Sequence, residues 1–266
     1  MTTDERRDLL DFAVRVAEHA GRGTLSHFGP EVAVERKVDG TPVTVADRES
    51  ERRVRAAIES RFPDDAVVGE EFGGDAEGGR RWIVDPIDGT KSFIHGVPLY
   101  GVLLALEVEG VPVIGVLHFP ALRATVAAAD GLGAWWNGRR ARVSNVDRLE
   151  RALVLTTGDS PSGPGAEADA AALRVAGWER LRAAGGMART WGDAYGYALV
   201  ATGRAEAMVD PLVRVWDVAP VRCILQEASG VFTDWAGTPS HTSGHAIATN
   251  AALADVVRAT LTGASV

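Results

Sequence analysis

The chain has 266 residues, of which 46% are hydrophobic, 24% charged and 6% aromatic. This composition is typical of a globular protein with enough apolar residues to bury a core, and it excludes a disordered, coiled-coil or collagen-like chain. Asp and Glu number 36 against 28 Lys and Arg, a formal net charge of −8, so the surface as a whole should repel nucleic acid and anionic lipid. We therefore expect neither nucleic acid nor a membrane as a partner.

Cys223 is the single cysteine, which excludes an intrachain disulfide and a thiolate metal cluster. Residues 2–8 are mostly charged, and no stretch of the chain approaches the roughly 18 apolar residues of a membrane-spanning helix. We therefore expect a cytoplasmic protein.

A helix opens the chain. Thr2 and Glu5 have the spacing of a capping box, and apolar residues at helical spacing follow until Gly21 or Gly23, where we expect the helix to end. A polar loop then leads to a second helix, which we expect to begin at Thr44 and to end at Pro63.

Strands dominate the rest of the first half. We expect them at residues 66–68, 82–84, 99–108, 111–117 and 125–126, and in a segment over 133–143 that turns at Asn137 and Gly138. Residues 99–108 and 111–117 flank a Glu-Gly turn, which predicts an antiparallel hairpin.

Helices and strands alternate in the second half, after a linker-like loop at residues 158–166. The expected helices cover residues 167–184, 192–202, 217–228 and 251–261, and the expected strands cover residues 187–190, 205–209, 231–233 and 246–249. This order predicts a mixed α/β fold with antiparallel sheet in its first half.

Two carboxylates follow the apolar strand that starts at Trp82. Because Pro86 cannot continue a strand ladder, we expect Asp85 at the strand end and Asp88 at the start of the next element. A helix beginning at Gly89 would place free N–H groups beside both carboxylates, an arrangement that suits a phosphate held by metal ions and backbone donors. The alternative is that Asp88 caps a helix and Asp85 serves a turn.

Acidic residues also stand at two other element ends. Glu70 and Glu71 follow the predicted strand 66–68, and Asp217 enters a predicted helix. Asp217 has a structural alternative as a helix N-cap, with Pro220 tolerated in the first turn.

Together the segments Gly69-Glu70-Glu71, Asp85 to Thr90 and Trp216 to Ala219 resemble the inositol monophosphatase superfamily of Mg²⁺-dependent, lithium-sensitive phosphomonoesterases. The resemblance covers nearly the whole chain. It implies a layered α-β-α-β-α sandwich like that of fructose-1,6-bisphosphatase, in which residues 1–145 and 146–266 form two halves of one compact unit with the site between them. By the same analogy we expect a homodimer.

The resemblance also implies a site that holds two or three Mg²⁺ ions. Its metal ligands would be Glu70, Asp85, the carbonyl of Ile87, Asp88 and Asp217. Hard oxygen donors are what Mg²⁺ requires, and so acidic a cluster needs divalent ions to offset its own repulsion.

In the implied mechanism, a metal-activated water near Glu70 and a Thr90–Asp47 pair attacks phosphorus in line, and a second metal stabilises the leaving alkoxide. Asp88, Gly89 and Thr90 would bind the phosphate. Asp47 has a structural alternative, because Thr44 and Asp47 have capping-box spacing. Lys37 matches a loop lysine near the family's site, with a solvated loop cation as the alternative.

The substrate is suggested by the segment from Arg189 to Tyr197, with its Gly-Asp at residues 192–193, by Lys91, and by the segments 70–73 and 248–250, which look most like the histidinol-phosphate phosphatase branch. Asp193, helped by Asp210, would pair with the cation of histidinol phosphate. Asp193 has an alternative as a helix N-cap, and Asp210 as a turn residue before proline.

Other activities stay open. Within the family these are hydrolysis of inositol 1-phosphate, 3′-phosphoadenosine 5′-phosphate or fructose 1,6-bisphosphate. A phosphatase with an aspartyl nucleophile would have Asp-x-Asp after its first strand, which is not the spacing here. A non-enzymatic metal-binding module would not need ligands scattered along the chain.

His241 and His245 have the spacing of a zinc pair, but they lie in a loop without a neighbouring cysteine, which disfavours zinc. His95 lies near Gly96 and could line the mouth of the site.

Overall fold

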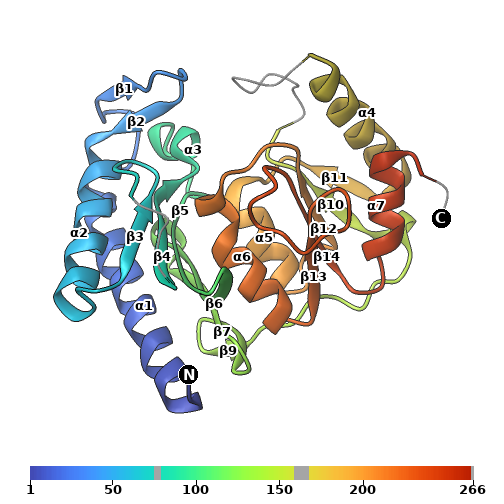
Figure 1. The fold of residues 1–266 in the computed structure, drawn as a ribbon. Coiled ribbons are helices and arrows are strands. Elements are labelled where there is room, and N and C mark those ends of the chain that lie inside the picture. The colour runs from blue at the N-terminus through green and yellow to red at the C-terminus, as the bar shows by residue number, and fades with distance from the viewer. Residues whose placement is uncertain (75–78, 159–167, 265–266) are drawn as a thin grey trace.

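The computed structural model describes residues 1–74, 79–158 and 168–264, so all of the expected linker 158–166 except Gly158 lies outside the described residues. Five layers stack across the molecule in Figure 1. Helices α1 and α2 form the first layer, a seven-stranded sheet the second, α5 and α6 the third, a five-stranded sheet the fourth, and α4 and α7 the fifth. The expected α-β-α-β-α sandwich is confirmed.

The helices of the described chain begin and end near the positions expected from the sequence. They are α1 (Thr3–Thr24), α2 (Val45–Arg61), α3 (Thr90–Ile94), α4 (Ala168–Ala184), α5 (Asp193–Ala201), α6 (Val215–Glu227) and α7 (Ala254–Thr262).

The larger sheet has the strand order β3-β4-β5-β6-β7-β8-β9, and only its β3–β4 pair is parallel. Its strands are β3 (Ala66–Gly69), β4 (Arg80–Asp88), β5 (Gly101–Val108), β6 (Val111–Phe119), β7 (Ala124–Ala129), β8 (Gly133–Trp136) and β9 (Arg139–Arg140). The predicted hairpin is the β5–β6 pair, and Glu109 and Gly110 at its turn have the positive φ angles of 49° and 78° that a tight hairpin requires.

The smaller sheet has the strand order β11-β10-β12-β14-β13, with β10 parallel to both of its neighbours. Its strands are β10 (Leu153–Leu155), β11 (Met187–Arg189), β12 (Ala207–Asp210), β13 (Gly230–Thr233) and β14 (Ala246–Asn250). The division of the chain at residues 145 and 146 stays a prediction, because α6 from the second half packs on strands of both sheets.

Three apolar clusters hold the layers together. One joins α1 and α2 to the outer face of the larger sheet, a second surrounds α5 and α6 between the sheets, and a third lies between the smaller sheet and helices α4 and α7. The middle cluster matters most for function, because it fixes α6 against β5 and β6.

Helix α1 ends at Thr24, next to the expected end at Gly23, and Gly21 packs against His118 and Pro120 where a side chain would clash. Three expectations about other elements were wrong. The expected polar loop contains a two-stranded pair, β1 (Val34–Arg36) and β2 (Pro42–Thr44). Strand β10 was not expected at all, and β4 does not end at Asp85.

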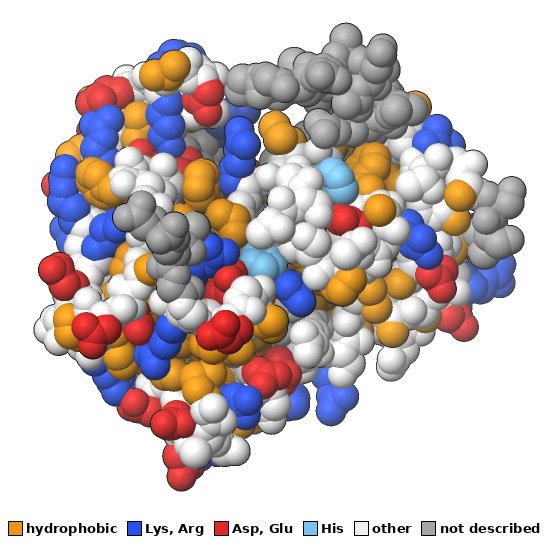
Figure 2. Space-filling model, viewed as in Figure 1, with side chains coloured by type: hydrophobic (Ala, Val, Ile, Leu, Met, Phe, Trp, Pro, Cys, Tyr) orange, Lys and Arg blue, Asp and Glu red, His pale blue; other side chains and the backbone are white. Residues whose placement is uncertain are grey.

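Both signs of charge are interspersed over the described residues of the face shown in Figure 2, so the net charge is not gathered into one acidic region there. Among the described helices, none is both long and apolar enough to cross a membrane.

Candidate active site

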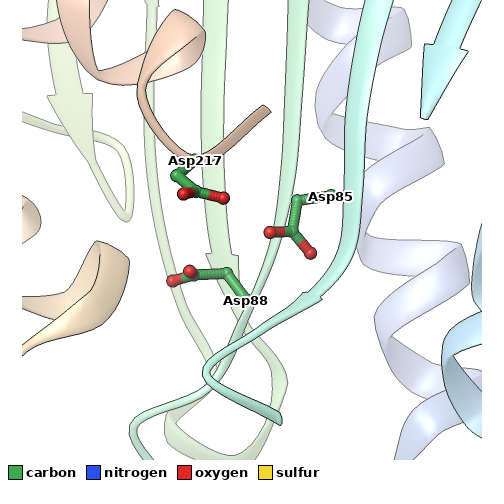
Figure 3. A group of neighbouring side chains, drawn as sticks. All are labelled: Asp85, Asp88 and Asp217. Carbon is green, nitrogen blue, oxygen red and sulfur yellow. The ribbon is translucent and has the colours of Figure 1, made fainter. Parts of the chain in front are cut away.

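Three aspartates from distant parts of the chain converge between the two sheets. Asp85 and Asp88 come from β4 and Asp217 from the first turn of α6, and Figure 3 shows their carboxylates pointing toward one another. One oxygen of each lies within 4.8 Å of the others. Three acids predicted from two separate sequence segments are therefore brought together.

The backbone of β4 explains the placement of Asp85 and Asp88. The strand runs through Pro86 to Asp88, and its register with β5 shifts between Asp85 and Asp88, as at a β-bulge. Pro86 lies beyond the last residue of β4 that pairs with β3, so it costs no ladder bond on that side. Asp85 Oδ1 accepts a hydrogen bond from Ile87 N at 3.0 Å, the local bond of a turn aspartate. The alternative in which Asp88 caps a helix is wrong, because Gly89 is the N-cap of α3.

Asp217 is the third residue of α6, not its N-cap. Its Oδ2 accepts a hydrogen bond from the backbone N–H of Arg214 at 2.7 Å, which closes the start of the helix. Pro220 consequently lies in the second turn, not in the first as expected. The structural alternative for Asp217 is therefore correct in a modified form, because the carboxylate that joins the acidic cluster also closes the start of α6.

Electrostatics make this cluster a candidate site for a cation. Burial, together with the carboxylates around them, raises the pKa of Asp85 and Asp88 well above the ordinary value. Burial and the neighbouring acids likewise raise the pKa of Asp217 to about 7. Carboxylates that repel one another this strongly fit a divalent ion, and their hard oxygen donors suit Mg²⁺.

Glu70 lies at the edge of this cluster. Its Oε1 lies 2.7 Å from Nζ of Lys37, which also lies 2.6 Å from Oε1 of Glu71. Burial raises the pKa of Glu70, and Lys37 opposes that shift. Lys37 is therefore a partner of the predicted acids and not a solvated loop cation.

Sequence reasoning missed Glu51, whose side chain is fully buried. Its carboxylate accepts hydrogen bonds from the backbone N–H groups of Glu71 and Phe72 and pairs with Arg55. It thereby holds the turn that presents Glu70. The Glu51–Arg55 spacing of four residues is a sequence signal for a helix pair, but it does not indicate burial.

Thr90, Asp47 and Ile87 meet on the other side of the cluster. The Thr90 hydroxyl donates to the Ile87 carbonyl at 3.1 Å and lies 3.4 Å from Asp47 Oδ1. Asp47 Oδ2 also accepts hydrogen bonds from the N–H and hydroxyl of Thr44, so the expected capping box exists as well. Asp47 is fully buried, and burial raises its pKa.

A cleft of about 780 Å³ opens beside these groups. Both halves of the chain line it, and the residues of interest are Glu70, Gly89, Thr90, Lys91, Thr157, Trp191, Asp193 and Asp210. Gly89 caps α3 with φ of 81°, a conformation that favours glycine.

Asp193 is the first residue of α5, and its side chain lies beside Gly89, at the start of α3. Its Oδ2 lies 3.0 Å from the position that a Cβ on Gly89 would take, and the next residue, Ala194, donates its N–H to Asp88 Oδ2 at 2.5 Å. Gly192 is the N-cap, so Asp193 does not cap the helix. Partial burial and the charge of Asp210 raise the pKa of Asp193 to about 6, against the opposing charge of Lys91.

Thr157 holds the second acidic pair in place and was not predicted. Its hydroxyl accepts a hydrogen bond from Asp193 N at 2.9 Å, and its own N–H donates to Asp210 Oδ1 at 2.9 Å. The Tyr197 hydroxyl donates to the other oxygen of Asp210 at 2.8 Å. Asp210 is therefore buried with protein partners on both oxygens, and Asp193 is the more accessible acid.

The remaining histidines have separate partners. His245 accepts a hydrogen bond from Trp235 N through Nδ1, while His241 lies between Glu107 and Arg222, so each ring already has protein partners. His95 Nδ1 bonds the carbonyl of Lys91, on the α3 side of the cleft.

Comparison with known proteins agrees with this geometry. The model of the inositol monophosphatase family matches residues 5–263. The chain is 44% identical over 245 residues to a histidinol-phosphatase of Chlorobaculum parvum, covering 90% of each chain. It is 40% identical over 258 residues to a histidinol-phosphatase of Mycobacterium tuberculosis, covering 94% of this chain and 96% of the relative.

Two other similarities concern differently named proteins. A fructose-1,6-bisphosphatase/inositol-1-monophosphatase of Thermotoga maritima is 36% identical over 231 residues, or 86% of each chain. The solved structure of the suhB suppressor protein of Bartonella henselae superposes with a TM-score of 0.87 at 29% identity, covering 96% of this chain and 98% of that one. The chain belongs to the inositol monophosphatase family, whose members are metal-dependent phosphatases.

Proposed function

We propose that the protein hydrolyses L-histidinol phosphate to L-histidinol and inorganic phosphate, a step of histidine biosynthesis. The observation that carries this proposal is the Asp193 carboxylate, which borders the cleft next to Gly89 with the charge of Asp210 behind it. A substrate with an ammonium group gains an ionic contact there that a neutral polyol does not. The two histidinol-phosphatases of similar sequence support the same substrate.

The phosphate would bind at the start of α3. Asp88, Gly89 and Thr90 lie at the end of β4 and the beginning of that helix, next to the acidic cluster. We assign Glu70, Asp85, the Ile87 carbonyl, Asp88 and Asp217 as the ligands of two or three Mg²⁺ ions. Such ions supply the positive charge that admits a phosphate dianion and makes water more acidic.

We assign the proton transfers to Glu70 and to the Thr90–Asp47 pair. Glu70 and Thr90 line the cleft, and Asp47 is buried next to Thr90, whose hydroxyl lies 3.4 Å from Asp47 Oδ1 and would relay a proton to it. Water positioned by these groups attacks phosphorus in line, opposite the alcohol oxygen that leaves. Asp193 holds the leaving alcohol by its ammonium group during that attack.

The test compares the rates of hydrolysis of histidinol phosphate and inositol 1-phosphate at saturating Mg²⁺. We expect a higher kcat/KM for histidinol phosphate. Inositol 1-phosphate is the alternative substrate, because a relative 36% identical bears inositol-1-monophosphatase in its name. A preference for inositol 1-phosphate would replace the proposed substrate and keep the metal site.

A variant makes the comparison sharper. Asp193→Asn should raise KM for histidinol phosphate and leave glycerol 2-phosphate unaffected, because only the first carries a cation. An equal loss on both substrates would remove the proposed role of Asp193. The homodimer and the cytoplasmic location stay predictions, and light scattering of the purified protein tests the first.

A further inference from the structure

Three large apolar side chains are left exposed around the cleft. Val97 is 40% exposed, and Trp191 and Leu212 are each 42% exposed, and all three line the cleft. A single exposed apolar residue needs no explanation, but three around one cleft that Asp193 and Asp210 also line place apolar surface beside acidic groups.

Trp191 is held by its neighbours and is not exposed through looseness of its loop. The next residue, Gly192, lies so close to Thr157 that a Cβ on it would be 2.1 Å from Thr157 Cα. The Trp191 carbonyl lies 2.8 Å from the position of a Cβ on Gly196, and Asp193 N bonds Thr157. The backbone that follows Trp191 is therefore closely packed.

An exposed indole on this closely packed backbone, two residues from an acid, defines a ligand chemistry. Asp193 offers negative charge, while the face of an indole offers a flat apolar surface that attracts cations and aromatic rings. The hydroxyl groups of a polyol would lose water against that face without gaining a hydrogen bond. A ligand with both a flat ring and a positive charge satisfies the two surfaces together.

We propose that Trp191 determines specificity by stacking against the ring of the leaving alcohol while Asp193 pairs with its ammonium group. This inference rests on the proposed function, and it divides recognition of the alcohol into a ring contact and a charge contact. Trp191 and Asp193 are two positions apart in the chain, so the ring contact and the charge contact hold the ring and the ammonium at a fixed separation.

The experiment measures KM and kcat of Trp191→Ala, Trp191→Phe and Asp193→Asn on three esters at saturating Mg²⁺. Histidinol phosphate carries ring and ammonium, phosphoethanolamine carries the ammonium alone, and glycerol 2-phosphate carries neither. Trp191→Ala should raise KM about 3- to 10-fold for histidinol phosphate only, with little change in kcat, since an aromatic contact contributes about 0.5–1.5 kcal/mol. Trp191→Phe should keep most of the affinity, and Asp193→Asn should weaken both ammonium esters.

Trp135→Ala is the matched control, because Trp135 is 40% exposed and lies on β8, away from this cleft. It should leave all three substrates unchanged. An equal rise in KM for every ester with Trp191→Ala, or no rise for any, would overturn the stacking role.

A second measurement separates this inference from the proposed function. If the native enzyme hydrolyses glycerol 2-phosphate but not histidinol phosphate, the proposed function fails. L-Histidinol is then tested as a competitive inhibitor of glycerol 2-phosphate hydrolysis. Inhibition that weakens about 3- to 10-fold in Trp191→Ala supports the ring contact, whereas absent or equal inhibition refutes it.

Discussion

The Nε2 atom of His241 lies 2.8 Å from Oε2 of Glu107, and both side chains are almost fully buried. His241 precedes β14 in the second half of the chain, and Glu107 belongs to β5 in the first. Arg222 Nη1 lies 3.1 Å from His241 Nδ1, and since a guanidinium only donates, Nδ1 accepts and Nε2–H donates to Glu107. Arg81 lies 2.9 Å from the other oxygen of Glu107.

We predict that this network contributes strongly to stability. Burial acts to raise the pKa of Glu107, but the bonds from His241 and Arg81 hold that pKa below its ordinary value. Glu107→Ala removes a buried carboxylate that both His241 and Arg81 contact, so it should lower the free energy of unfolding by about 3–5 kcal/mol. Urea denaturation measures this. Asp255→Ala, which breaks an exposed pair with Arg258, is the control and should cost less than about 1 kcal/mol.

The aspartate cluster should be indispensable for turnover. Replacing Asp85, Asp88 or Asp217 singly by Asn removes a hard charged ligand while keeping size, so phosphate release should fall on the order of 10²-fold or more. A Mg²⁺ titration of phosphate release measures it. Asp130→Asn, at an acid paired with Arg6 on the surface, should retain activity. Full turnover of Asp88→Asn at saturating Mg²⁺ would contradict the metal assignment.

Local signals made much of this site predictable. Asp85, Asp88 and Asp217 each stand at or near an element end in a short motif, and the fold brings these ends together. The partners that come from elsewhere in the chain left no such signal. Thr157 follows β10, whose residues Leu153–Leu155 form only three positions and pair with strands that lie far along the chain. A strand so short has no periodicity to detect.

Besides these distant partners, the burial of charged side chains could not be predicted from the sequence. Glu51 and Glu107 look like ordinary charged residues of a helix and a strand, yet both lie in the interior with arginine partners. The partner of Glu107 that faces it from the other half, His241, is 134 residues away. Such pairs depend on the packing of the layers, which no local pattern specifies.

Magnesium should stabilise the fold more at high pH than at low pH. In the metal-free protein the pKa of Asp217 is raised to about 7, above its unfolded value near 4. Between those values the folded state holds a proton that the unfolded state releases, so this group's stabilising contribution is lost as pH rises from about 4 to about 7. Mg²⁺ binds the ionised carboxylates, so its stabilisation should grow over the same range.

The measurement is the melting temperature with EDTA and with saturating Mg²⁺, at about pH 5 and about pH 8. In Asp217→Asn, the rise in melting temperature caused by Mg²⁺ should differ less between the two pH values. That variant also controls for other titrating groups, such as His118, whose pKa burial lowers to about 4 and whose effect has the opposite sign. A Mg²⁺ shift of equal size at both pH values in the native protein would refute the coupling.

Close packing of α6 on β6 should govern the position of Asp217. A Cβ on Gly115 would lie 2.3 Å from the carbonyl oxygen of Pro220 and 3.1 Å from its Cα, and backbone atoms cannot rotate away. Gly115→Ala should therefore push α6 off the sheet and destabilise the protein by about 1–3 kcal/mol. Since Asp217 is on the same helix, the Mg²⁺ concentration for half-maximal activity should rise as well.

Gly158→Ala is the matched control, because a Cβ there would meet no atom of the described residues within 4 Å. It should change neither the urea midpoint nor the Mg²⁺ requirement. Gly115→Ala could instead lower stability and leave the Mg²⁺ requirement unchanged. That result would show that α6 moves only near Pro220 while its first turn stays in place. The carboxylate of Asp217 would then be held by its bond to Arg214 N and not by the packing of the helix on the sheet.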